Sequence, residues 1–241
     1  MEICSMADVK TAIVTGGTGA LGSVIASAFL NKGMQVAIPT RTAASTVKIP
    51  QELKQFADRL MTAEAEISRE SSSREFAQEV LRHFGSIDVL VNTAGGYAGG
   101  EMIGEVSGAT LESMLSANLN TTFMMCSAVL PAMRKAKTGR IINIAASAAL
   151  NPGVKRGPYA IAKRAVVTLT ETIAEEMKGT GITANAIAPS IIVTDANRES
   201  MPSADTSRWV TPQEIAAIVL FLCSDGARSV NGNVLKVFGG V

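Results

Sequence analysis

Short apolar runs rich in valine and isoleucine alternate with longer stretches of helical spacing along the whole chain. The runs with the length and composition of buried strands occupy residues 10–15, 35–40, 87–92, 140–145, 182–188 and 234–238. They show little alternation between apolar and polar residues, as expected for strands that are covered on both faces. A further strand is predicted near residues 60–67, where the pattern is weaker.

Between these runs, apolar residues recur at the spacing of one helical face, most clearly over residues 21–29. Further helices are predicted near 72–84, 110–135, 159–178 and 211–224, whereas 41–50 and 190–208 are predicted to be irregular. This alternation predicts an α/β fold, a single-domain Rossmann-like doubly wound parallel β-sheet of about seven strands with helices on both faces. No repeat or linker divides the chain, so residues 1–241 are expected to form one domain.

The composition narrows the possible functions. The 241 residues include 22 basic and 21 acidic side chains, and at a net charge of +1 neither nucleic acid nor an anionic membrane is expected as a partner. The single histidine, His83, excludes a histidine-rich metal site and leaves a Ser-His-Asp triad with only one candidate. No metal site is therefore expected, and other side chains must move protons in any catalysis.

The cysteines and the chain start indicate a compartment. Cys4, Cys126 and Cys223 are far apart and form no Cys-x-x-Cys pair, which is typical of a reducing environment. Residues 1–10 lack the basic start and apolar run of a signal peptide. The longest apolar stretch, 215–223, is far shorter than the roughly 20 residues that a membrane helix needs. We therefore expect a cytoplasmic protein.

A glycine-rich segment, TGGTGALG at residues 15–22, joins the first predicted strand to the first predicted helix. Gly17, Gly19 and Gly22 match the pattern G-x-G-x-x-G, which is weak alone and stronger between a strand and an amphipathic helix. Such glycines let backbone N–H groups approach a pyrophosphate at the positive end of the helix. A mononucleotide P-loop is disfavoured, because Ser23 stands where lysine would follow Gly22. The segment predicts a dinucleotide site, and a glycine turn without a ligand is the alternative.

The end of the second predicted strand indicates which dinucleotide binds. An acidic residue there would accept the adenosine ribose hydroxyls of NAD. This chain has Thr40 and Arg41 instead, and no carboxylate before Glu52. A guanidinium pairs well with a 2′-phosphate, so NADP (NADPH) is favoured and NAD stays possible. The alternative is a solvated Arg41 with weak cofactor selectivity.

Tyr159 and Lys163 are the best acid–base candidates. They begin a predicted helix just after Pro158, at positions i and i+4, so the phenol and the ammonium share one helical face. A nearby positive charge stabilises phenolate and lowers the pKa of a tyrosine from about 10. We therefore expect Lys163 to lower the pKa of Tyr159, and Tyr159 to act as general acid or base. An ordinary surface pair is the alternative.

Together these features resemble the short-chain dehydrogenase/reductase (SDR) family over essentially the whole chain. TGGTGALG is similar to its cofactor loop, and residues 92–95, NTAG, resemble its N-N-A-G motif. Tyr159 and Lys163 match its catalytic pair, and Asn118 lies in a segment similar to the one that carries its catalytic asparagine. Residues 189–194 resemble its P-G-x-I-x-T segment.

The resemblance implies hydride transfer between nicotinamide C4 and the carbonyl or imine of a small-molecule substrate. Tyr159 would give or take the proton, Lys163 would bind the nicotinamide ribose, and Asn118 would hold a water that relays protons. A homodimer or homotetramer built through the long helices is also implied. The implied cofactor-binding residues are Gly16, Thr18, Gly19, Ala20, Leu21, Gly22, Arg41, Glu66, Asn92, Ala94, Gly95, Tyr159, Lys163, Pro189, Ser190, Ile192 and Thr194.

The catalytic serine of the family is displaced in this chain. The usual spacing from Tyr159 leads to Ala146, and Ser147 follows one residue later. Neighbouring residues on a strand point to opposite faces. Ser147 is therefore a candidate catalytic residue only if the strand has already turned, and otherwise it packs or hydrogen-bonds elsewhere.

One branch of the family, quinoid dihydropteridine reductase, has alanine at the serine position. The loop at 95–100 and the segment at 197–209 also resemble this branch, which makes Gly96, Tyr97 and Trp209 candidate substrate residues. The branch typically prefers NADH, which Arg41 does not favour. The leading hypothesis is an NADP(H)-dependent SDR oxidoreductase. A dihydropteridine reductase-like enzyme and a non-catalytic NAD(P)-sensing protein are the alternatives.

Overall fold

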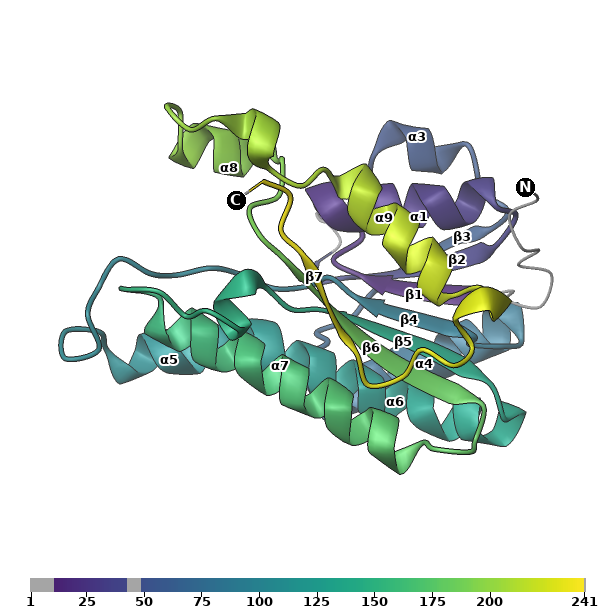
Figure 1. Ribbon diagram of the computed structural model, residues 1–241. Coiled ribbons are helices and arrows are strands. Elements are labelled where there is room, and N and C mark those ends of the chain that lie inside the picture. Colours follow the sequence, from purple (N-terminus) through teal and green to yellow (C-terminus); the bar gives the residue numbers. More distant parts are fainter. Residues whose placement is uncertain (1–10, 43–48, 241) are drawn as a thin grey trace.

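A computed structural model of the protein describes residues 11–42 and 49–240. At its centre is a parallel sheet of seven strands in the order β3-β2-β1-β4-β5-β6-β7 (Figure 1). The predicted doubly wound α/β fold is confirmed. The strand order reverses between β1 and β4, and sheets of this kind bind ligands in the crevice at the carboxyl ends of the strands beside such a reversal.

The strands are short and mostly buried. Their bounds are β1 Thr11–Thr15, β2 Gln35–Thr40, β3 Leu60–Glu64, β4 Val89–Asn92, β5 Gly139–Ile144, β6 Ile182–Pro189 and β7 Val234–Val237. Every residue of β1, β4 and β6 is buried, which explains why their sequences do not alternate. The edge strands β3 and β7 are only partly buried, and the sequence pattern of β3 is correspondingly weak.

Helices cover both faces of the sheet (Figure 1). One face carries α1 (Ala20–Asn31), α3 (Gln51–Lys54) and α9 (Pro212–Leu222). The other face carries α4 (Glu70–Phe84), α5 (Gly108–Met114), α6 (Thr121–Ala136) and α7 (Gly157–Glu176). Within the described ranges, no helix is both long enough and apolar enough to cross a lipid bilayer.

Each face of the sheet has its own apolar core. Phe29 of α1 packs with Ile215 of α9 in one core, and Phe76 of α4 packs with Met125 of α6 in the other. Cys223 and Cys126 lie in these two cores, one in each, where burial raises the pKa of each thiol to about 12. Both thiols therefore stay protonated at neutral pH. Cys4 lies outside the described residues.

The long helix predicted at 110–135 is divided. α5 ends at Met114, a π-helical turn η1 (Leu115–Asn120) follows, and α6 begins at Thr121. Turns of this kind are rare and often occur at functional sites. This one contains Asn118, whose side chain is buried.

The two segments predicted to be irregular differ in outcome. Residues 43–48 of the first lie outside the described residues. The second contains a short helix, α8 (Asp195–Ser200), and a 3₁₀ turn, η3 (Thr206–Arg208). Thr194 caps α8 by accepting the Asn197 N–H at 3.2 Å, a capping pattern that the sequence reasoning overlooked.

Residues 191–210, here named the flap, stand beyond the carboxyl ends of the strands (Figure 1). The two ends of the flap are tied together by a parallel bridge between Ile192 and Val210. The Val193 N–H donates to the Val210 carbonyl at 2.8 Å, and the Val210 N–H donates to the Ile191 carbonyl at 2.9 Å. The Gly240 N–H also donates to the Arg208 carbonyl at 3.0 Å. The base of the flap is therefore fixed to the sheet.

Candidate functional site

The glycine-rich segment forms a tight turn between β1 and α1. Gly16 has a φ of 65°, in the left-handed region, and its carbonyl accepts the Gly19 N–H at 2.9 Å. α1 begins at Ala20 with Gly19 as its N-cap, and it has neither a side-chain cap nor an acidic residue in its first turn. The N–H groups of Ala20, Leu21 and Gly22 have no partners within the helix. The turn therefore offers donors at the positive end of a helix, which is an arrangement that binds anions.

Packing requires glycine at two positions of this turn. A Cβ on Gly16 would lie 2.8 Å from Thr93 Oγ1 and 2.9 Å from the Ala94 nitrogen. A Cβ on Gly22 would overlap the Gly16 carbonyl. The turn therefore lies directly against the end of β4, and this close packing needs glycine at both positions.

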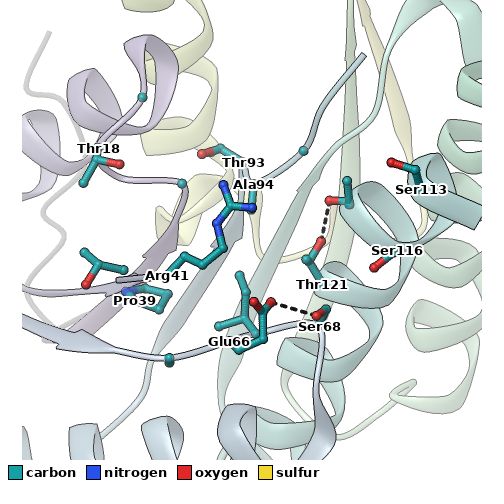
Figure 2. A pocket seen from close by; sticks show the side chains of 17 residues that line it. Thr18, Pro39, Arg41, Glu66, Ser68, Thr93, Ala94, Ser113, Ser116 and Thr121 are labelled. Atoms are coloured by element: carbon teal, nitrogen blue, oxygen red, sulfur yellow. Dashed lines mark hydrogen bonds between the residues drawn. The ribbon is translucent and has the colours of Figure 1, made fainter. Parts of the chain in front are cut away.

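A cavity of about 590 Å³ extends from this turn across the carboxyl ends of β2, β3 and β4 (Figure 2). The predicted cofactor residues that line it are Gly16, Thr18, Gly19, Arg41, Glu66, Ala94 and Gly95. Sequence reasoning missed the hydroxyl side chains on its walls, which are Ser68, Ser113, Ser116 and Thr121. They come from separate elements and belong to no local motif, so only the fold brings them together.

Arg41 and Glu66 point into this cavity from the loops that follow β2 and β3 (Figure 2). None of the ion pairs in the described part of the chain involves Arg41. Glu66 accepts a hydrogen bond from Ser68 Oγ at 2.7 Å. At the last position of β2, the buried Thr40 donates its hydroxyl to the Ala63 carbonyl at 3.3 Å. The end of β2 thus presents a cation and a hydroxyl, where NAD sites carry a carboxylate.

The end of β4 is fastened to β1 beneath the cavity. Thr15 Oγ1 accepts the N–H groups of Thr93 and Ala94, each at 3.1 Å, and Thr93 Oγ1 donates to the Thr15 carbonyl at 2.5 Å. The Asn92 side chain is buried and donates to Asn143 Oδ1 at 2.8 Å. The Asn92 side chain therefore supports the cavity floor from the interior.

α7 brings Tyr159 and Lys163 to the same edge of the sheet. Lys163 is 6% exposed, and its Nζ donates to the carbonyl of Ile144, the last residue of β5, at 2.8 Å. The same Nζ lies 6.0 Å from the centroid of the Tyr159 ring. A Cβ on Gly95 would lie 3.4 Å from Nζ, so the ammonium borders the cavity floor.

Burial sets the pKa values of this pair. Burial raises the pKa of Tyr159 to about 12, with a smaller rise from Tyr97 and an opposing fall from Arg156. Burial also lowers the pKa of Lys163 from 10.5 to about 8. The predicted fall in the pKa of Tyr159 is therefore wrong, because desolvation of the phenolate by burial is the largest effect and raises the pKa. At neutral pH Tyr159 is a protonated phenol beside a lysine ammonium.

Asn118 connects the π turn to the loop after β4. Its Nδ2 donates to the carbonyls of Gly96 at 3.0 Å and Met114 at 2.9 Å, and its Oδ1 accepts the Gly96 N–H at 3.3 Å. These two bonds with Gly96 clamp the loop against η1. The water relay expected at Asn118 stays a prediction.

The segment after β5 places Ala146 among the residues around Tyr159. The backbone of Ala146 is extended, with φ −160° and ψ 160°, so side chains still alternate at this point. Ala146, Ala148 and Ala160 form a buried cluster against which Tyr159 packs. Ser147 lies between the first two in sequence and begins the 3₁₀ turn η2 (Ser147–Ala149). The geometry favours Ala146 as the residue that faces Tyr159, and a catalytic role for Ser147 stays a prediction.

Tyr97 packs against Tyr159 from the loop after β4. Its ring meets the Tyr159 ring edge to face, with centroids 5.0 Å apart and planes at 81°. Tyr97 is 61% exposed, so it stands between Tyr159 and solvent.

The remaining predicted residues lie at the end of β6 and in the flap. Pro189 ends β6, and Ser190 Oγ donates to the Phe238 carbonyl at 2.7 Å. Ile192 pairs in the flap bridge, and Thr194 caps α8. Trp209 is 6% exposed beside this bridge and anchors the base of the flap. Its contact with substrate stays a prediction.

The comparisons with known proteins agree on one family. The chain matches the sequence model described as short chain dehydrogenase over residues 10–205. It is 33% identical to D-threitol dehydrogenase from Mycolicibacterium smegmatis, covering 97% of this chain and 93% of that protein. It is 32% identical to the 3-oxoacyl-(acyl-carrier-protein) reductase FabG from Chlamydia trachomatis, covering 96% of this chain and 97% of that protein.

Solved structures are similar over the same length. ElxO with NADP bound superposes with a TM-score of 0.90 at 26% identity, covering 96% of this chain and 98% of that chain. The crystal structure of gox2181 superposes with a TM-score of 0.89 at 27% identity, covering 97% and 95%.

Proposed function

The chain belongs to the short-chain dehydrogenase family and is an oxidoreductase, and from this premise we propose that it transfers hydride between NADP(H) and a carbonyl or imine-type substrate, with Tyr159 as acid or base. The observation that carries the proposal is the Tyr159–Lys163 pair at the edge of a cavity whose floor is Gly95. A nicotinamide cofactor supplies or accepts hydride at C4 of its ring. The protein must hold that ring beside the substrate and move one proton.

The protonation states suit Tyr159 to proton donation. With a pKa of about 12, the phenol holds its proton at neutral pH and can give it to the oxygen or nitrogen that hydride transfer makes basic. Lys163, fixed by the Ile144 carbonyl, holds its positive charge below pH 8. That charge stabilises the phenolate that remains after proton transfer. Asn118 keeps Gly95 and Gly96 in place beside both groups.

The preference for NADP is supported by Arg41. The guanidinium lines the cavity, engages in none of the ion pairs of the described residues, and follows a strand end without a carboxylate. An unpaired guanidinium at this place is suited to the 2′-phosphate of NADP. Thr18 faces the same cavity from the glycine-rich turn and adds a hydroxyl donor.

The test is Tyr159→Phe, assayed with NADPH against a 3-oxoacyl thioester, simple ketones and quinonoid dihydropterin. We expect kcat to fall by about 10²- to 10⁴-fold, with the Kd for NADPH unchanged, because only the phenol oxygen is lost. A variant that keeps full kcat on a substrate of the wild type would refute the assignment of Tyr159. Binding of NADPH without turnover by the wild type would instead favour a cofactor-sensing protein.

A second candidate is the reduction of a quinonoid dihydropterin, favoured by Ala146 at the position beside Tyr159. The charge that develops on such a substrate spreads over a conjugated ring, so one fewer hydrogen-bond donor is tolerable. The assay with quinonoid dihydropterin distinguishes this candidate, because a ketone reductase would prefer the thioester or the ketones.

We further propose a cytoplasmic homodimer or homotetramer that assembles through the long helices. Phe123 on α6 is 48% exposed and Ile161 on α7 is 49% exposed, and both are large apolar side chains on helices that cover the same face of the sheet. Burial of these side chains against a second copy would remove apolar surface from water.

A further inference from the structure

Ala146, which faces Tyr159 in the site described above, has no side-chain hydrogen-bond donor. Ala146 and its neighbours in the cluster offer Tyr159 only methyl groups. A carbonyl that accepts hydride develops negative charge on oxygen, and a single donor at that oxygen is worth about 10²- to 10³-fold in rate. A carbonyl reductase with this site therefore needs a donor from another element.

The chain contains only two tyrosines, and they are in contact. Tyr97 approaches Tyr159 from the loop after β4, whereas Ala146 comes from the end of β5. The two phenols are also close enough for Tyr97 to contribute to the raised pKa of Tyr159. Within the described part of the chain the Tyr97 hydroxyl makes no hydrogen bond, and the residue is 61% exposed.

The position of Tyr97 is built into its loop. A Cβ on Gly99 would lie 2.5 Å from the Tyr97 hydroxyl and 2.9 Å from the Lys155 carbonyl, so the loop folds this closely only with glycine there. The Gly100 N–H donates to the same Lys155 carbonyl at 2.9 Å. On the other side of Tyr97, Gly96 is clamped by Asn118 through two hydrogen bonds. Both flanks of Tyr97 are therefore held, and its hydroxyl lies beside Gly99.

We propose that Tyr97 is a second catalytic phenol, which donates a hydrogen bond to the substrate oxygen or nitrogen that Tyr159 protonates, in place of the serine that Ala146 replaces. Tyr97 keeps its own proton throughout, and Tyr159 alone transfers one. This assignment rests on the proposed function, since it names a further residue of the same reaction. Because the donor is a phenol on a loop, the site is wider on its Ala146 side than a site with serine there.

The test compares Tyr97→Phe, Ala146→Ser and the double variant under the conditions used for Tyr159→Phe. Tyr97→Phe keeps the ring contact with Tyr159 and removes only the oxygen, and at an exposed position it leaves folding intact. We expect kcat to fall about 10²- to 10³-fold with little change in the Kd for NADPH. Adding Ala146→Ser to Tyr97→Phe restores at least about tenfold of that loss.

The outcomes separate this inference from the proposed function. Full kcat in Tyr97→Phe together with inactivation by Tyr159→Phe would overturn the inference and leave the proposed function standing. A loss in Tyr97→Phe that Ala146→Ser does not restore would also overturn it, since it would assign Tyr97 a packing role. A wild type without turnover of any substrate in the panel would count against the proposed function itself.

Discussion

Replacing Lys163 with methionine is expected to stabilise the protein in the absence of cofactor while abolishing hydride transfer. The Lys163 ammonium is buried, and burial lowers its pKa because the charged form has lost its water. The buried ammonium of Lys163 therefore lowers the free energy of unfolding at neutral pH. Methionine has a similar length, favours helix, and carries no charge to desolvate.

The magnitude follows from the pKa. The fall in the pKa of Lys163 from 10.5 to about 8 means that its buried charge lowers the free energy of unfolding by about 3 kcal/mol at neutral pH. Loss of the hydrogen bond from Nζ to the Ile144 carbonyl offsets about 1 kcal/mol of the gain. The expected net gain is about 2 kcal/mol, which for a chain of this length raises Tm by roughly 4–8 °C.

The same pKa values determine whether the free energy of unfolding rises or falls with pH. The folded protein releases the Lys163 proton near pH 8 and the unfolded chain near pH 10.5, so between these values the unfolded state binds more protons. The free energy of unfolding of the wild type therefore rises with pH relative to that of the variant. We expect the advantage of Lys163→Met to be largest at pH 7 and to shrink between pH 8 and about 9.5.

The assay is urea-induced unfolding of both proteins without cofactor at several pH values from 7 to 9.5. Lys135→Met is the matched control, because Lys135 is exposed in the last turn of α6 and its charge is solvated. The reasoning fails if Lys163→Met is less stable than the wild type at pH 7, or if the difference between them does not change with pH.

Two further predictions concern the cofactor. Arg41→Ala should weaken NADPH binding at least about tenfold and leave NADH binding nearly unchanged. Calorimetric titration measures both affinities, with Arg69→Ala as the control. Equal losses for both cofactors would refute the 2′-phosphate assignment. Gly95→Ala should raise the KM for cofactor at least about tenfold, because its Cβ would lie 2.6 Å from Asn118 Oδ1. Gly96→Ala is the control, since its Cβ would meet only ordinary contact at 3.8 Å, and equal KM values for the two variants would contradict this account.

The sheet could be predicted because its strands are covered on both faces. Short runs rich in isoleucine and alanine such as 182–188 are typical of strands buried on both faces, and β6 occupies Ile182–Pro189. The edge strand β3 was harder to predict, because only one of its five residues is buried. The π turn at Leu115–Asn120 leaves no trace in the apolar pattern, since it changes the backbone hydrogen bonding and not the buried face.

In the site too, features formed by residues close in sequence could be predicted, whereas contacts between distant segments could not. The glycine-rich turn and the Tyr159–Lys163 pair are local in sequence, so their spacing predicts their placement. The pKa of Tyr159 was predicted in the wrong direction, because burial depends on distant elements that pack around the helix. The clamp between Asn118 and Gly96 is also a contact between distant segments, and neither residue type alone indicates it.

The bridge between Ile192 and Val210 makes the flap a loop that is closed at its base. The bridge and the Gly240–Arg208 hydrogen bond fix both ends of the flap to the sheet, so the span between them can change in length or sequence without disturbing the strands. The entropy of closing this loop is lost when the chain folds and not when a ligand arrives. Insertions or deletions within residues 195–207 are therefore expected to change the free energy of unfolding little and to leave α7 with Tyr159 and Lys163 in place.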